Sequence, residues 1–128
     1  MKMILFGSST HFQRNVKATK SKFAQNSGWI NLGERLSKQF RDDYFFIAYT
    51  GISGNTRGFY GKKQKLKKLI PNSIEKTVDE KYDSNIEIMY LSKNRDKEIL
   101  DQAVYSRFKG NTFYEIDLTK TVDGLFFI

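Results

Sequence analysis

The stretch IAYTGISGNTRGFYGKKQKLKKLI, residues 47–70, gathers side chains that can bind an anion. Arg57 lies between Gly54 and Gly58, and glycines let a backbone approach a ligand closely. The planar guanidinium group of arginine also matches the geometry of a phosphate. Tyr49, which ends an apolar run, could position or activate a water molecule. We therefore expect a phosphate site here, although a solvated turn is the alternative for Arg57 and a core position is the alternative for Tyr49.

A run of lysines follows the glycine-rich turn. Lys62, Lys63 and Lys65 come shortly after Tyr60 in the chain. Lysines contact phosphate backbones without reading the base sequence, and exposed aromatic rings stack on bases. These four residues are therefore candidate nucleic-acid contacts, although some lysines in such a run simply face solvent.

Two carboxylates further along the chain are candidate metal ligands. Asp101 follows Glu98 by about one helical turn, a spacing that lets both carboxylates meet one hard cation. The sequence has no cysteine and one histidine, which nearly excludes a zinc site and leaves Mg²⁺ or Mn²⁺ as the expected cofactor. Pairing with Lys97 is the alternative role of Asp101.

The only histidine, His11, is the one available base for a serine hydrolase. Ser8 and Ser9 precede it too closely for a typical catalytic triad. A capping or surface position is the alternative, so the role of His11 stays open at this point.

Charge is divided unevenly along the chain, whose net charge is +8. Residues 1–70 contain 14 basic and 3 acidic side chains, whereas residues 71–128 contain 8 and 11. A basic half is typical of proteins that bind polyanions, because lysine and arginine replace condensed counterions. We expect nucleic acid or a nucleotide as the partner, with a lysine-rich surface as the alternative.

Hydrophobic periodicity predicts the elements that must position these residues. The expected strands cover residues 1–7, 43–51 and 84–92, with one or two more over 112–120 and 124–128, where apolar runs or alternation prevail. The expected helices cover residues 10–40 with a break near 26–28, residues 62–70 before Pro71, and residues 95–110. The result is an α/β (α+β) fold in which helices flank a small, mainly antiparallel central sheet.

The length of 128 residues indicates one domain over residues 1–128, since a chain of this size can bury a core. We divide it into an N-terminal strand and helices (1–43), a middle segment (44–111) and C-terminal strands (112–128). The absence of cysteine favours the cytoplasm, and no apolar run is long enough for a signal peptide or a membrane span. The oligomeric state is left open.

The middle segment resembles the GIY-YIG nucleases. YTGIS at residues 49–53 is similar to the second half of the motif that names them, and IEIMYLSKNRDKEILDQAVYSRFKGN is similar to the strand and helix that present their metal-binding glutamate. The resemblance spans about residues 44–111 and places Asp101 at the position of that glutamate. It implies a small endonuclease in which Tyr49 and Arg57 act on the phosphate and Asp101 or Glu98 holds the metal.

Three functions are consistent with these observations. The first is a metal-dependent endonuclease that hydrolyses phosphodiester bonds. The second is a non-catalytic binder of nucleic acid or a phosphorylated nucleotide, from a phage or mobile element. The third is a metal-independent ribonuclease of the toxin type that uses His11 and Arg57. The sequence leaves open whether the protein is an enzyme at all.

Overall fold

The computed structural model describes residues 3–5, 7–22, 25, 28, 30–57, 61–82 and 89–128. The helices are α1 (Ser9–Phe12), η1 (Val16–Ala18), α3 (Leu32–Phe40), η2 (Arg41–Asp43), α4 (Ile74–Tyr82), α5 (Lys97–Gln102) and α6 (Leu118–Thr121). The strands are β1 (Ile47–Thr50), β2 (Asn55–Arg57), β3 (Lys63–Lys65), β4 (Met89–Ser92), β5 (Tyr105–Ser106), β6 (Tyr114–Glu115) and β7 (Gly124–Phe127). Within these residues, the helices are too short or too polar to cross a bilayer. A cytoplasmic location stays a prediction.

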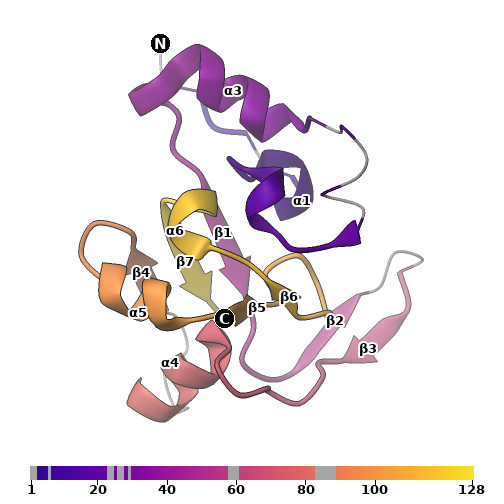
Figure 1. The fold of residues 1–128 in the computed structure, drawn as a ribbon. Helices are drawn as coiled ribbons and strands as arrows, with labels where there is room; N and C mark the ends of the chain where they lie inside the picture. The colour runs from indigo at the N-terminus through magenta and orange to yellow at the C-terminus, as the bar shows by residue number, and fades with distance from the viewer. Residues whose placement is uncertain are drawn as a thin grey trace.

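A three-stranded sheet lies at the centre, in the order β1-β7-β4 (Figure 1). β1 runs parallel to β7, with Ile47 opposite Gly124, and β4 runs antiparallel to β7. Two antiparallel ribbons, β2-β3 and β5-β6, accompany the sheet, and the β2-β3 ribbon projects away from it in Figure 1. The predicted α+β class, a small sheet flanked by helices, is confirmed.

One face of the central sheet carries the core. Along β1 the side chains alternate, so that Ala48 and Thr50 are buried while Ile47 and Tyr49 are exposed. This alternation is expected, because successive side chains of a strand point to opposite faces. Helices and the segments next to β5 and β6 supply the rest of the core, which consists of Phe46, Ala48, Ile74, Val78, Leu91, Leu100, Ala103, Phe108, Ile116, Leu118, Val122, Leu125 and Phe127.

The opposite face of the sheet presents a row of aromatic rings. Tyr49 of β1 and Tyr90 of β4 both stand opposite Phe126 of β7, so the row crosses all three strands. The ring centroids of Tyr90 and Phe126 are 4.8 Å apart, a distance at which aromatic pairs attract. Tyr90 also covers Gly124, where an added Cβ atom would come within 2.3 Å of the tyrosine hydroxyl. Tyr49 remains 58% exposed at the end of the row.

The N-terminal helices are attached to the sheet by Arg14. Its Nε donates to Asp123 Oδ2 at 2.7 Å, and the same carboxylate oxygen accepts the backbone N–H of Phe46 at 2.8 Å. A further Arg14 nitrogen donates to the carbonyl of Tyr44. Asp123 precedes β7, so this one carboxylate joins α1, the start of β1 and the start of β7.

The helix predicted over residues 62–70 is wrong. Residues 63–65 form β3, and the chain then runs without helix to Pro71. A helix would place lysines three and four positions apart on its surface, where like charges repel. The extended path instead lets Asn111 donate to the carbonyl of Lys65 at 2.9 Å and accept the N–H of Lys67 at 2.7 Å.

Other predicted boundaries also differ from the structure. Residues 3–5 and 7 do not form the expected first strand, and in the described part of residues 10–40 the long helices are replaced by short helical turns and α3. The helix over 95–110 ends at Gln102, and α6 interrupts the predicted C-terminal strands after Asp117, whose side chain caps its N-terminus. The expected helix break near residues 26–28 falls largely outside the described residues.

The two faces of the sheet predict different costs of substitution. Ile47→Lys should lower the free energy of unfolding by less than about 1 kcal/mol, because the Ile47 side chain is 42% exposed on the aromatic face. Leu125→Ala, in the adjacent strand, should cost about 2–5 kcal/mol, because Leu125 is fully buried. Urea denaturation of both variants measures the difference. An equal loss in the free energy of unfolding of both variants would show that the Ile47 side chain is buried.

Candidate active site

A cavity of about 420 Å³ lies where the parallel strands β1 and β7 end. The carboxyl ends of parallel strands are where open α/β sheets bind ligands. Its lining consists of Ser8, Ser9, Tyr49, Thr50, Gly51, Ser53, Asn55, Thr56, Arg57, Leu66, Arg107, Phe108, Lys109, Gly110 and Ile128. We call this the strand-end cavity.

Arg107 holds the loop that follows β1. Its side chain is buried, with Nε and Nη2 donating to the carbonyl of Gly51 at 3.0 and 2.7 Å. Nη2 also donates to the carbonyl of Ile52 at 2.7 Å, and Nη1 donates to that of Lys67 at 2.5 Å. One guanidinium group therefore fixes the turn after β1 and the segment after β3 against each other, and these segments form the cavity wall.

Glu75 fixes the other side of Arg107. Its Oε1 accepts hydrogen bonds from Thr50 Oγ1 at 2.7 Å, Ser106 Oγ at 2.9 Å and the backbone N–H of Arg107 at 3.0 Å. Glu75 is fully buried in the first turn of α4, so it ties that helix to the end of β1 and to β5. Burial lowers the pKa of Arg107, while the nearby Glu75 charge opposes that effect.

The groups that face the strand-end cavity are mainly cationic or hydroxylic. Tyr49 and Arg57 are exposed at its wall, and Lys109 is half-buried there. The part of the chain that the structure describes contributes neither an acidic side chain nor an imidazole to this wall. The arrangement therefore suits a developing negative charge on a ligand oxygen.

His11 does not line the strand-end cavity. It is exposed on α1, and its backbone N–H donates to the carbonyl of Ser8 at 2.9 Å. Ser8, which precedes α1, and Ser9 both line the cavity. The backbone of His11 is therefore hydrogen-bonded to a residue of the cavity wall.

The structure brings together only some of the predicted site residues. Tyr49 and Arg57 both line the strand-end cavity. Lys62, Lys63 and Lys65 are exposed on or just before β3, where they do not line the cavity. Tyr60 lies outside the described residues.

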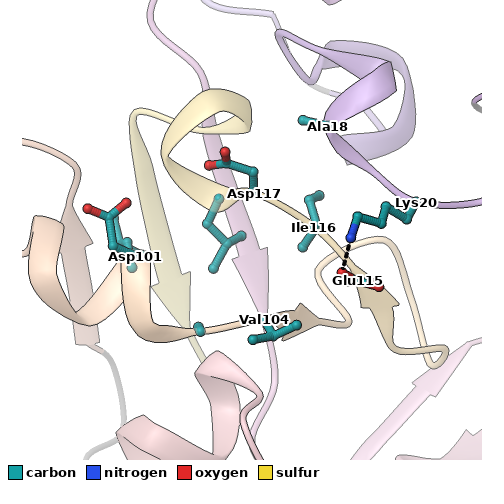
Figure 2. A pocket seen from close by; sticks show the side chains of 10 residues that line it. Ala18, Lys20, Asp101, Val104, Glu115, Ile116 and Asp117 are labelled. Atoms are coloured by element: carbon teal, nitrogen blue, oxygen red, sulfur yellow. Dashed lines mark hydrogen bonds and ion pairs between the residues drawn. The ribbon is translucent and has the colours of Figure 1, made fainter.

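The predicted metal ligands lie elsewhere. Glu98 and Asp101 are exposed on α5, and Asp101 lines a second cavity of about 270 Å³. Figure 2 shows this second cavity, with Asp101 and Asp117 on one side and the ion pair of Lys20 with Glu115 on the other. The two cavities share no lining residue. Among the described residues, no three histidine, cysteine or acidic side chains form a group that could hold a metal.

The sequence reasoning missed Arg107, Glu75 and Lys109. One signal was available: Arg107 interrupts the apolar run AVYSRF, which indicates a cation inside the fold. α4 was also missed, although Ser73 before the run of Ile74, Val78 and Tyr82 is a helix start followed by one apolar face.

Removing the Arg107 guanidinium should destabilise the fold. Arg107→Met leaves the carbonyls of Gly51, Ile52 and Lys67 without their donor, so we expect a loss of about 3–5 kcal/mol in the free energy of unfolding. Arg107→Lys should lose less, because an ammonium group keeps some of these bonds. Denaturant titration measures both. The matched control is Arg95→Met, because Arg95 is an exposed arginine paired with Asp96, and it should change stability little.

Comparison with known proteins gives the family of the chain. The family model described as Erythromycin esterase matches residues 1–128. A Bacillus cereus protein of known structure has a similar fold, with a TM-score of 0.64 and 18% identity over 94% of this chain and 31% of that one. A mutant of the erythromycin esterase EreC, in its open conformation, gives a TM-score of 0.62 and 15% identity over 88% of this chain and 29% of that one. No curated protein matched the sequence.

The chain thus spans about a third of the length of these solved structures. The same findings overturn the resemblance to GIY-YIG nucleases, and with it the endonuclease function, the alternatives of a nucleic-acid binder and a ribonuclease, and nucleic acid as the partner. The physical reason is visible in the fold, because the expected basic helix is absent and Asp101 faces a different cavity from Tyr49 and Arg57. With its whole length matched, the chain belongs to the erythromycin esterase family.

Proposed function

We propose that the strand-end cavity takes part in hydrolysing the ester bond of a macrolide lactone. The observation that carries this proposal is the family match over the whole chain. A volume of about 420 Å³ is in the range of sites that bind drug-sized ligands. The activity of the longer relatives comes to this chain only as part of the proposal, since the chain spans about a third of their length.

The shape of the site suits a large apolar ring. The aromatic row of Tyr90, Phe126 and Tyr49 leads to the strand-end cavity, because Tyr49 belongs to both. A macrolide ring could lie over the exposed Tyr49 while its ester group enters the cavity. Contact with an aromatic ring stabilises such an apolar surface in water.

Ester hydrolysis requires a base for the attacking water and a cation for the oxyanion that forms. In this proposal Arg57 stabilises the oxyanion, because its guanidinium belongs to the cavity wall and is a strong hydrogen-bond donor. His11 is the proposed base, since it is the only histidine of the chain and adjoins Ser8 at the cavity.

The role of a metal stays a separate proposal. Mg²⁺ or Mn²⁺ at Asp101 and Glu98 would lie at the second cavity, away from Tyr49 and Arg57. The hydrolysis proposed here routes no step through that ion, and parallel assays with Mg²⁺ and with EDTA separate the two ideas.

The test is incubation of the purified chain with erythromycin, with the opened lactone detected by mass spectrometry as the gain of one water. His11→Asn should reduce the rate about 10²–10⁴-fold, the usual contribution of a general base. Arg57→Ala should reduce it about 10²–10³-fold, as removal of an oxyanion donor does. Lys63→Ala is the matched control, because Lys63 stands opposite Arg57 in the β2-β3 ribbon but does not line the cavity.

Two results would contradict the proposal. Absence of ring opening by a folded wild-type chain would show that these residues do not suffice for hydrolysis. Equal losses of the ring-opening rate in Lys63→Ala and Arg57→Ala would show that any change in the β2-β3 ribbon lowers the rate. The Arg57 guanidinium would then have no specific role in hydrolysis.

A further inference from the structure

Lys109 has an unusual environment for a lysine. Its Nζ donates to Thr19 Oγ1 at 2.8 Å and lies 5.7 Å from the ring centroid of Tyr114 and 6.0 Å from that of Phe108. The side chain is half-buried, and the residue forms part of the wall of the strand-end cavity. Most lysines are instead exposed or paired with a carboxylate.

The charged groups around Lys109 leave its amine without a counterion. On the segment before β6, the guanidinium group of Arg107 donates its hydrogen bonds to backbone carbonyls. On the segment beside Thr19, Lys20 takes up the Glu115 carboxylate in an ion pair. Within the described residues, no carboxylate forms an ion pair with Lys109, and Tyr114 presents only its ring to the amine.

Burial consequently lowers the pKa of Lys109 to about 8. Near that pH about half of the side chain is a neutral amine, whereas an ordinary lysine with a pKa near 10.4 is almost fully protonated. A neutral amine has two N–H bonds and one lone pair. Since Thr19 Oγ1 accepts only one of its hydrogens, the lone pair remains available for reaction.

We propose that Lys109 is a nucleophilic amine of the strand-end cavity that accepts acyl groups from activated carboxylic esters. This acylation site is independent of the hydrolysis proposed above, because it requires neither water activation nor His11. A desolvated lysine is an established type of nucleophile for carbonyl groups.

The reaction balances without another reagent. The lone pair of Lys109 Nζ attacks the ester carbonyl, and a tetrahedral oxyanion forms. When the carbonyl is restored, the C–O bond to the leaving group breaks, and the leaving alkoxide or phenoxide takes the proton that the nitrogen loses. The products are an amide at Lys109 and one alcohol or phenol. The amide is stable, so the protein is modified once and does not turn over.

The experiment uses the full wild-type chain and 4-nitrophenyl acetate at several pH values between about 6 and 10. Acetylation of each lysine is followed by peptide mass spectrometry. At pH 8 we expect Lys109 to react roughly ten times faster than the exposed Lys65 of β3, because it has far more neutral amine at that pH. Its rate should rise up to about pH 8 and then level off, since protonation blocks the amine only below its pKa.

Variants separate this proposal from a merely accessible lysine. Tyr114→Ala removes one covering ring, which should return water to the amine, raise the pH at which the rate levels off and reduce the advantage over Lys65. His11→Asn should leave the acetylation of Lys109 unchanged even where it abolishes hydrolysis of erythromycin. Acetylation of Lys109 no faster than that of Lys65 at pH 8 would overturn the proposal, as would a rate that still rises steeply above pH 9.

Discussion

The buried guanidinium of Arg107 is the constraint on which the site depends. It satisfies carbonyls from the turn after β1 and from the segment after β3, two places far apart in sequence. Buried carbonyls without donors are costly, so these segments can stay close only while the guanidinium is present. Glu75 holds the same residue through its backbone N–H and reaches the end of β1 through Thr50. The cavity wall is therefore determined by one buried cation and one buried carboxylate.

The sheet beneath the site is covered unevenly. Parallel strand pairs, such as β1 and β7, are usually buried on both faces. Here one face carries the core, and the other presents Phe45, Ile47 and Tyr49 at 59%, 42% and 58% exposure. Since Tyr49 also lines the strand-end cavity, the apolar face and the polar cavity form a continuous surface. A ligand with an apolar body and one reactive carbonyl is complementary to both parts.

The sequence pattern within a segment predicted those strands that are stabilised mainly by burial of their own side chains. The strand expected over 43–51 contains β1, and the run GLFFI contains β7, because alternate side chains of both segments are buried in the core. The prediction of a helix over 62–70 was wrong, because hydrogen bonds from Asn111 and Arg107, which lie at least 40 residues away in sequence, stabilise an extended path instead. Such distant partners leave no periodic signal in the segment itself.

In the site, residue types indicated candidate side chains but did not identify the ligand on which they act. Arg57 and Tyr49 were found from their residue types and their place beside glycines, and both do line one cavity. What they act on could not be inferred, because a guanidinium group that suits a phosphate suits equally the oxyanion of an ester under attack.

The charge of the basic half of the chain also led to a wrong prediction of the ligand. Its lysines on β3 are exposed outside the cavity, whereas the cations that shape the wall, Arg107 and Lys109, belong to the acidic half. Net charge describes the long-range field of a protein, but the chemistry of a site follows from which few charges the fold buries together.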